Sequence, residues 1–540
     1  MRSGPRAPKV PALLLAALTT ITPGCAGSGS EASAGGRQGG DRPNILFIFS
    51  DDHAAHALSA YRDHLPYGAE LPDTPGLDRL AADGMLFVNA FVTNSICAPS
   101  RATVLSGQYG HLNGVMTNVE EFHPSHVTFP ALLRASGYRT AIFGKWHLKA
   151  DPGPQVFDHY ELLRGQGPYY NPTLRSAGDS TSWEGYTPDI VSDRAMAWMD
   201  GTIEESDAPF LAMVQFNAAH RYWDPGPEEL ELYRDTPLPE PATMWDDGAG
   251  RLFAGRTPEM TIELDLFARD LKLEAPNNLT PDQQRAWDAA YDAENAELEA
   301  MSLSGDALTR WKYQRYITDY MRTVAAVDAN VTRLLQHLED AGLADNTIVV
   351  YTSDQGFFLG DHGWFDKRWM YEESLRTPLL VRWPGVVEPG SVNRDLVMNL
   401  DFARTLLDAA GVDADPAMQG MSLVPLLHGE RVEWRDAIYY QYFEYPGWHM
   451  VRRQYGVRTE RYKLIYFYEE GGWELFDLER DPSELRSVYD DPRYRSVVTE
   501  LEGRLADLRE QYGAPEVDPV PHREFDAPAD LRRPGVTSGM

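Results

Sequence analysis

The sequence predicts an α/β protein in which helices flank a large, mostly parallel sheet and a smaller antiparallel subdomain follows. From residue 42 onward, short apolar runs alternate with amphipathic stretches, which is the order of βαβ units. Near residue 430 the pattern changes to alternating stretches rich in aromatic residues, which is typical of antiparallel strands. The chain has 540 residues, more than a single hydrophobic core usually serves, so we expect one large domain and a smaller one.

Five apolar runs are the clearest strand candidates of the large sheet. They are ILFIF at 45–49, TAIF at 140–143, FLAMVQF at 210–216, TIVVY at 347–351 and PLLV at 378–381. Unbroken apolar runs of this length suit strands that are covered on both faces. Residues 307–341 carry apolar side chains at helical spacing, and Gly342 is expected to end that helix.

The remaining segments are assigned from composition. The predicted antiparallel strands lie at 437–443, 450–457, 462–468 and 473–476, and a helix is predicted around 495–512. We expect the following boundaries: a signal segment at 1–25, a flexible linker at 26–41, a catalytic domain at 42–430 with an acidic insertion at 222–306, a C-terminal subdomain at 431–512 and a Pro-rich tail at 513–540.

The N-terminus has the layout of an export signal. Three cations, at Arg2, Arg6 and Lys9, precede an apolar run at residues 10–21 that is too short to span a bilayer. Cys25 and the Gly/Ser/Ala-rich stretch after it resemble a bacterial lipid-attachment site, although Thr22 stands where leucine is usual. Ordinary cleavage is the alternative. Either reading predicts an exported protein, periplasmic or on the cell surface. In the lipid-attachment reading, a lipid at Cys25 is its one membrane contact.

The composition excludes some functions. The chain has 49 Lys and Arg against 81 Asp and Glu and no basic run, which excludes a general nucleic-acid binder. An anionic small substrate stays open, since a few local cations can dominate one pocket. Only two cysteines occur, Cys25 and Cys97, so we expect no intramolecular disulfide and no cysteine metal site.

Polar residues follow four of the predicted strands, where ligands bind in open α/β sheets. These residues are Asp51 and Asp52, then Lys145 and His147, then Asn217 and His220, and finally Asp354 and Gln355. Each has a simpler explanation when taken alone, such as a helix cap for Asp51 or Asp52 and a turn residue for Asp354. Their convergence on one sheet edge favours a functional site.

The oxygen donors among them indicate a hard metal ion. Asp51, Asp52, Asp354 and Gln355 offer carboxylate or amide oxygens without any cysteine, and the sequence has no HExxH pattern. This donor set suits Ca²⁺ or Mg²⁺ better than zinc. Spacing alone leaves calcium and magnesium both open.

Cys97 lies in the segment NSICAPSRATVLSG, at 94–107. Pro99 fits the first turn of a helix, which places Cys97 at the positive N-terminal end. The residues alone leave three readings open: a residue beside an anion site, a buried structural cysteine, and an activated thiol nucleophile.

Two motifs in this chain resemble the signatures of the formylglycine-dependent sulfatases, a family of the alkaline phosphatase-like superfamily. CAPSRATVLSG at 97–107 resembles the first signature, with Ser106 where threonine is common, and GYRTAIFGKWH at 137–147 resembles the second. The resemblance covers roughly residues 42–510 and includes PNILFIFSDDH, TSDQGFFLGDHGWFDKR and MYEESLRTPLLVRWPG. Within the family, the stretch DQGFFLGDHGWFDKRWMYEES resembles exported bacterial carbohydrate sulfatases more than simple aryl sulfatases.

The resemblance implies a site. Cys97 would be oxidised by a formylglycine-generating enzyme to Cα-formylglycine, whose aldehyde hydrate is the family's nucleophile. The calcium ligands would be Asp51, Asp52, residue 97, Asp354 and Gln355, where many relatives have asparagine in place of Gln355. Arg101 would orient residue 97, and Lys145, His147, His220 and Lys367 would surround the sulfate. Arg368 stands beside Lys367 and could exchange roles with it.

The function expected from the resemblance is hydrolysis of a sulfate ester, on a sulfated carbohydrate from a glycosaminoglycan or an algal polysaccharide. His220, with Lys367, would protonate the leaving alcohol, and His147 would take a proton in the second step. A first alternative is a phosphodiester or phosphonate monoester hydrolase of the same superfamily. A second is a non-catalytic surface lipoprotein that binds sulfated glycans.

Overall fold

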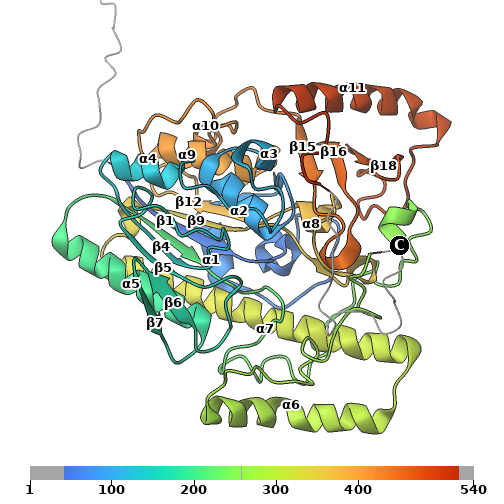
Figure 1. Ribbon diagram of the computed structural model, residues 1–540, viewed down its shortest axis with the longest axis horizontal. Coiled ribbons are helices and arrows are strands. Elements are labelled where there is room, and N and C mark those ends of the chain that lie inside the picture. The colour runs from blue at the N-terminus through green and yellow to red at the C-terminus, as the bar shows by residue number, and fades with distance from the viewer. Residues whose placement is uncertain (1–41, 257, 522–540) are drawn as a thin grey trace, which may run out of the picture. The chain divides into compact units, whose positions relative to one another are not determined.

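The computed structural model describes residues 42–256 and 258–521. Within them, a ten-stranded mixed sheet has the order β13-β2-β12-β9-β1-β8-β4-β5-β6-β7 (Figure 1). Its central strands are β1 (Asn44–Ser50), β4 (Arg139–Gly144), β8 (Phe210–Gln215), β9 (Thr347–Ser353) and β12 (Leu379–Arg382). The outer strands are β2 (Met85–Phe87), β5 (His159–Leu162), β6 (Thr173–Ser176), β7 (Asp179–Ser182) and β13 (Ser391–Asn393).

All five apolar runs form strands of this sheet. β9, β1, β8 and β4 lie side by side and parallel, whereas β12, from the fifth run, pairs antiparallel with β9. The predicted α/β class with a mostly parallel centre is therefore confirmed. The outer strands were not predicted, because they are short and several carry polar side chains.

Successive residues of β1 point to opposite faces, and each face is covered by helices. Ile45 and Phe47 pack against α2 (Cys97–Ser106), α4 (Phe129–Ala135) and α9 (Phe402–Ala409). Leu46 and Ile48 pack against α1 (Pro75–Ala82), α5 (Thr187–Glu205) and α7 (Gly305–Asp340). Figure 1 shows α2, α4 and α9 above the sheet and α5 and α7 below it. This double covering explains the continuous apolar runs.

The predicted long helix is α7, which ends at Asp340, one residue before the cap Ala341. Gly342 follows with φ +69°, a left-handed conformation that ends the helix at low cost. Tyr316, Ile317 and Tyr320 belong to one core cluster, and Val327 and Leu334 to another. The helix therefore joins two cores along its length.

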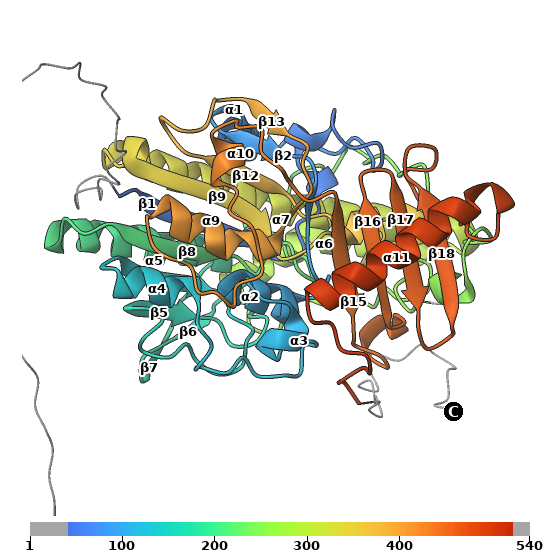
Figure 2. The ribbon, with the colours of Figure 1, turned by 90° about the horizontal axis from the view of Figure 1, so that it is seen from above.

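The C-terminal residues form an antiparallel sheet in the order β15-β16-β17-β18, with α11 lying across it (Figure 2). The bounds are β15 (Ala437–Tyr442), β16 (Gln454–Thr459), β17 (Tyr462–Phe467), β18 (Gly472–Asp477) and α11 (Arg495–Gln511). β16 begins four residues after the predicted start at 450, since residues 448–450 form a 3-10 turn. The sheet shares a core cluster with Trp369 and Tyr371 of the large domain.

The acidic stretch 222–306 folds as loops and one helix. That helix is α6 (Pro281–Met301), and its N-terminus is closed by a capping box between Thr280 and Gln283. Short elements complete the described residues: α3 (Gly110–Asn113), α8 (Glu372–Leu375), α10 (Val424–Leu427), the pair β3 (Ala90–Phe91) and β14 (Val397–Met398), and the pair β10 (Phe358–Leu359) and β11 (Phe365–Asp366).

Some predictions lie outside the described residues. They are the signal segment, the linker, the lipid site at Cys25 and the part of the tail beyond residue 521. Among the helices that the structure describes, none combines the length and the apolar character needed to cross a bilayer.

Candidate active site

The ends of β1 and β9 bring the predicted acids together. The two strands pair in parallel with Ser50 opposite Ser353, so the residues that follow each strand emerge side by side. The backbone N–H of Asp52 donates to Asp354 Oδ1 at 3.1 Å. Asp51, Asp52 and Asp354 each offer a carboxylate oxygen, and these oxygens lie within 4.8 Å of one another.

Gly144 fixes the approach of Lys145 to this cluster. Its φ is +94°, and a Cβ atom there would lie 2.0 Å from the carbonyl oxygen of Gln215. Only glycine therefore lets the end of β4 lie this close to β8. The N–H of Lys145 then donates to that same carbonyl at 2.8 Å, and its buried ammonium group pairs with Asp51.

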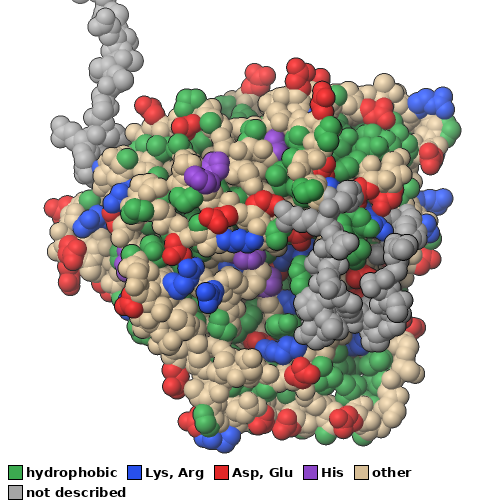
Figure 3. Space-filling model, in the orientation of Figure 1, with side chains coloured by type: hydrophobic (Ala, Val, Ile, Leu, Met, Phe, Trp, Pro, Cys, Tyr) green, Lys and Arg blue, Asp and Glu red, His purple; other side chains and the backbone are tan. Residues whose placement is uncertain are grey.

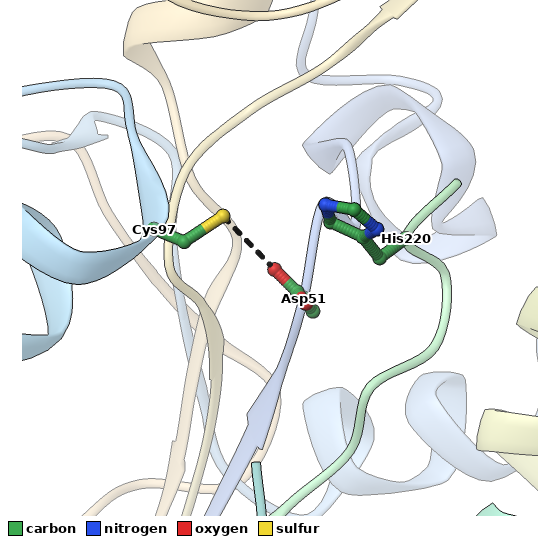
Figure 4. Close-up of side chains that lie close together, drawn as sticks. All are labelled: Asp51, Cys97 and His220. Carbon is green, nitrogen blue, oxygen red and sulfur yellow. Dashed lines mark hydrogen bonds between the residues drawn. The ribbon is translucent and has the colours of Figure 1, made fainter. Parts of the chain in front are cut away.

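Cys97 is the first residue of α2 and faces the end of β1. Its Sγ atom lies 3.5 Å from Asp51 Oδ1. Figure 4 shows the thiol, Asp51 and the ring of His220 converging from a helix, a strand end and a loop. Burial raises the pKa of the Cys97 thiol, and Lys145 and Lys367 offset this only in part. A protonated thiol argues against the activated-thiolate reading.

Arg101 lies one turn after Cys97 on α2 and binds the acids rather than the thiol. Its Nε and Nη2 atoms lie 3.1 and 3.0 Å from Asp354 Oδ2. Nη1 donates to Gln215 Oε1 at 2.6 Å, and the guanidinium lies 4.9 Å from the centroid of the Phe49 ring. The planar fork thus holds α2 against the ends of β8 and β9.

The structure separates Lys367 from its neighbour Arg368. Lys367 Nζ lies 2.6 Å from both carboxylate oxygens of Asp52. Burial disfavours the charged ammonium, but Asp52 outweighs it and raises the pKa of Lys367. Arg368 instead donates to Asp366 Oδ1 at 2.7 Å. Lys367 is therefore the cation of this pair that reaches the carboxylate cluster.

The two predicted histidines lie on opposite sides of the cluster. His220 Nε2 is 3.7 Å from Asp52 Oδ2, and its Nδ1 lies 2.6 Å from the carbonyl oxygen of Arg221. His147 Nε2 lies 3.4 Å from the side-chain nitrogen of Gln166. Burial, reinforced by Lys145, holds the pKa of each ring well below its usual range. Both rings are neutral at neutral pH.

We expect the low pKa of His147 to extend the active pH range downward. A base works only while it is unprotonated, so a pKa below the usual 6.5 keeps the ring competent at lower pH. At saturating Ca²⁺, the acid limb of the kcat profile should lie below pH 6.5. The measurement is kcat from pH 4.5 to 8. An acid limb centred above pH 6.5 would contradict a base role for His147.

The acids fit a divalent cation. Burial, aided by repulsion from neighbouring carboxylates, raises the pKa of Asp52 to about 8 and that of Asp354 to about 6. Gln355 donates its amide N–H to Asp52, which leaves its buried Oε1 atom without a hydrogen-bond partner. Three carboxylates and an unpaired amide oxygen form the hard donor set that Ca²⁺ and Mg²⁺ prefer.

A cavity of about 1000 Å³ opens above this cluster. Cys97, His147, His220 and Lys367 line it, whereas Arg101, Lys145 and the three acids are buried beneath. In the space-filling view, histidine and basic side chains gather near the middle of this face (Figure 3). All ten predicted residues thus lie at or directly under one cavity.

Comparison with known proteins identifies the family. The model of the family described as "Sulfatase" matches residues 43–412. The chain belongs to the sulfatase family. A second family model, "N-sulphoglucosamine sulphohydrolase, C-terminal", matches residues 360–511. The protein is therefore an enzyme, a sulfuric ester hydrolase, and the non-catalytic alternative is set aside.

Relatives of this sulfatase act on amino sugars. It is 42% identical to the N-acetylglucosamine-6-O-sulfatase of Bacteroides thetaiotaomicron, with 87% of each chain covered. It is 28% identical to human N-acetylglucosamine-6-sulfatase, covering 82% of this chain and 73% of the human protein. A solved enzyme in complex with its substrate D-glucosamine-2-N,6-O-disulfate superposes with a TM-score of 0.85 at 42% identity, covering 88% of this chain and 99% of that one.

The fold alone does not distinguish sulfate ester hydrolysis from phosphonate monoester hydrolysis. A phosphonate monoester hydrolase from Silicibacter pomeroyi has a TM-score of 0.66 at 21% identity, covering 88% of the sulfatase and 96% of that chain. Both proteins have the alkaline phosphatase-like arrangement.

Sequence reasoning missed part of the cavity wall. Asp366 and His449, which the sequence did not single out, line the cavity beside Arg368, and these three residues have positive φ, of 78°, 64° and 88°. His449 Nε2 lies 3.3 Å from Asp366 Oδ2. Strained backbone conformations of this kind cluster at functional sites. Asp366 and Arg368 flank Lys367 in a quoted motif, but no spacing rule connects them with His449.

Removing the charge of Lys367 should disable the sulfatase. Lys367→Met leaves Asp52 without its cation and removes a positive charge beside the sulfate position, so kcat/KM should fall by about 100-fold or more. Steady-state kinetics would measure the loss. Lys312→Met is the matched control, because Lys312 contacts the carbonyl of Glu263 outside the cavity. Equal kinetics for the two variants would contradict the assignment.

Proposed function

We propose that this sulfatase hydrolyses the 6-O-sulfate ester of a glucosamine residue in a sulfated carbohydrate. Support comes from the 42% identity to a protein named N-acetylglucosamine-6-O-sulfatase, and from the 42% identity to a solved structure whose bound substrate is a 6-O-sulfated glucosamine. The source of the sugar is a glycosaminoglycan in this proposal.

The observation that carries the proposal is the position of Cys97 at the cavity floor. Its Sγ atom lies 3.5 Å from Asp51, and Lys145 and Lys367 pair with the acids on either side. A sulfate group entering this cavity meets residue 97 together with two fixed cations. Preorganised charge of this kind is what transfer of an anionic group requires.

Two groups complete the site in this proposal. Asp51, Asp52, Asp354, Gln355 and residue 97 would hold Ca²⁺, and a formylglycine-generating enzyme would convert Cys97 within its CAPSR sequence. Formylglycine supplies an oxygen nucleophile through its hydrated aldehyde, and Ca²⁺ supplies a Lewis acid for the sulfate oxygens.

The side chains of this protein then position the sulfate and move protons. Lys145 and Lys367 neutralise the sulfate oxygens. His220 holds its Nδ1 proton on the carbonyl of Arg221, so a second proton is held at Nε2. The bound sulfate anion favours this protonated ring, and the proton then passes from Nε2 to the leaving alcohol. His147 accepts a proton at Nδ1, a buried nitrogen with no hydrogen-bond partner.

Export is part of the proposal. The cations at Arg2, Arg6 and Lys9, the apolar run at 10–21 and the small residues around Cys25 support a signal that directs the enzyme to the periplasm or the cell surface. Labelling with a clickable fatty acid tests the lipid anchor. Wild type should incorporate the label and Cys25→Ala should not.

A panel of esters tests the proposed activity. We expect sulfate release from N-acetylglucosamine 6-sulfate and from glucosamine-2-N,6-O-disulfate, and at least about 100-fold less from the matched glucosamine 3-sulfate. An aryl phosphodiester tests the phosphodiester and phosphonate alternative, which only the shared fold favours. Preference for the 3-sulfate would overturn the proposed position, and preference for the phosphodiester would overturn the proposed chemistry.

A further inference from the structure

The C-terminal segment that follows α11 lies against the substrate cavity. Val520 and Pro521 line the cavity together with the loop 444–449. Val520 is buried, although composition predicts only a Pro-rich tail here. The start of the segment is bound to α11, where the side chain of Arg509 donates a hydrogen bond of 2.7 Å to the carbonyl oxygen of Pro515.

One buried guanidinium joins this segment to the loop. Arg453 is 2% exposed, and its Nε and Nη2 atoms donate to the carbonyl of Tyr445 at 3.1 and 2.7 Å. Its Nη1 atom donates to Asp518 Oδ2 and to the carbonyl of Val520, both at 2.8 Å. Nη2 also reaches the carbonyl of Pro521 at 3.3 Å. The fork of a single arginine therefore holds two segments that both line the cavity.

Asp518 is the acidic partner that fixes the segment. Besides Arg453, it accepts a hydrogen bond of 2.7 Å from the hydroxyl of Tyr468. Its other oxygen accepts the N–H of Val520 at 2.8 Å. Three bonds to one carboxylate set the position of Val520 at the cavity wall.

The same loop is also tied to the catalytic side of the cavity, at both of its ends. Glu444 accepts the N–H of Asn118 at 2.9 Å, and Asn118 accepts the N–H of Ala98, next to Cys97, at 3.0 Å. His449 contacts Asp366 beside Lys367. The loop thus joins residues beside Cys97 and Lys367 to the C-terminal segment.

We propose that Val520 and Pro521 form a substrate-binding wall, and that Arg453 and Asp518 are positioning residues that clamp it to the loop 444–449. This inference rests on the proposed saccharide substrate. The wall contacts the sugar and not the reacting sulfate. It therefore sets KM for the saccharide and leaves the chemistry of the ester unchanged.

The test compares variants on two substrates, N-acetylglucosamine 6-sulfate and 4-nitrophenyl sulfate. Asp518→Ala should raise KM for the saccharide about tenfold, with kcat and the aryl sulfate kinetics within twofold of wild type. Asp518→Asn keeps an oxygen acceptor, so its KM for the saccharide should lie between those of wild type and Asp518→Ala. Glu516→Ala is the matched control, because Glu516 is an exposed acid of the same segment. Thermal unfolding checks that each variant is folded.

A second measurement does not depend on turnover. In the inactive Cys97→Ala variant, N-acetylglucosamine 6-sulfate should slow hydrogen exchange in peptides that cover 444–449 and 515–521. The wall would be overturned if Asp518→Ala left KM for the saccharide unchanged, or if it reduced kcat/KM equally for the saccharide and the aryl sulfate. It would also be overturned if the saccharide did not slow hydrogen exchange in 515–521. If wild type hydrolyses the aryl sulfate and no sulfated saccharide, the proposed substrate fails and the wall fails with it.

Discussion

Cys97→Ala should abolish sulfatase turnover, with a loss of roughly 10⁴-fold or more in kcat, because it removes the atom from which the proposed nucleophile is made. The substitution leaves Asp51, Asp52, Asp354 and Gln355 in place. Calcium should therefore still raise the midpoint of thermal unfolding, through the free energy of binding to the folded state. Sulfate release and thermal unfolding with and without Ca²⁺ measure the two effects.

Cys97→Ser is the matched variant for this prediction. Its hydroxyl restores the volume of the side chain, but a single hydroxyl offers no second oxygen to resolve a covalent step. We expect it to be as inactive as Cys97→Ala. Full activity in either variant would overturn the role of residue 97, and loss of the calcium effect in both would show that the carboxylates alone do not bind the ion.

Glu372→Ala should destabilise the fold by about 3–5 kcal/mol, since it removes a buried carboxylate from Arg376 and Arg458, whereas Lys463 keeps Glu484. Glu372 is 3% exposed and lies at the start of α8. It pairs with Arg376, with Arg458 at 3.2 Å and with Lys463 at 2.9 Å, and the last two belong to the C-terminal sheet. This cluster holds that sheet against the segment that carries Lys367. Urea unfolding measures the change.

The pH dependence of stability gives a second test of the cluster around Glu372. Burial disfavours the charged carboxylate, but Arg458, Lys463 and Arg376 outweigh it and hold the pKa of Glu372 well below its usual range. A lowered carboxyl pKa stabilises the folded state above the unfolded value, about 4.3, and that contribution disappears as the pH falls toward the folded value. Wild type should lose this contribution on acidification below about pH 4, and Glu372→Ala should lack it.

An exposed ion pair serves as the control. Arg285 and Asp282 pair on α6 with side chains 71% and 85% exposed. Solvent screens such pairs, so Asp282→Ala should change the free energy of unfolding by less than about 1 kcal/mol. Similar losses for Asp282→Ala and Glu372→Ala would contradict the importance of burial at the cluster.

The central strands and the residues at their ends could be predicted from the sequence. β1, β8 and β9 are buried on both faces, so their central residues form the continuous apolar runs 45–49, 210–214 and 348–351. Each polar residue that ends such a run has a structural explanation when taken alone, but parallel pairing places these residues together at one edge of the sheet. Asp51, Asp52, Lys145, Asp354 and Gln355 therefore stood out before any fold was known.

The C-terminal half of the cavity could not be predicted in this way. His449 and Val520 reach the cavity because the C-terminal sheet and the segment after α11 fold back onto it, across about 80 to 150 residues of chain from Lys367. Their local sequences show only loop character. The choice between Lys367 and Arg368 is of the same kind, since backbone conformation turns one toward Asp52 and the other toward Asp366.

The sequence by itself determined the α/β class, the polar residues that follow the central strands, and the family signature around Cys97. These features are local, because burial of a strand on both faces and the end of a strand each produce a recognisable pattern within a few residues. Only the tertiary structure decided which side chains form the far wall of the cavity, and that a single arginine, Arg453, joins two of its segments. Those contacts join residues far apart in the chain, where side-chain position depends on the packing of the whole protein rather than on local pattern.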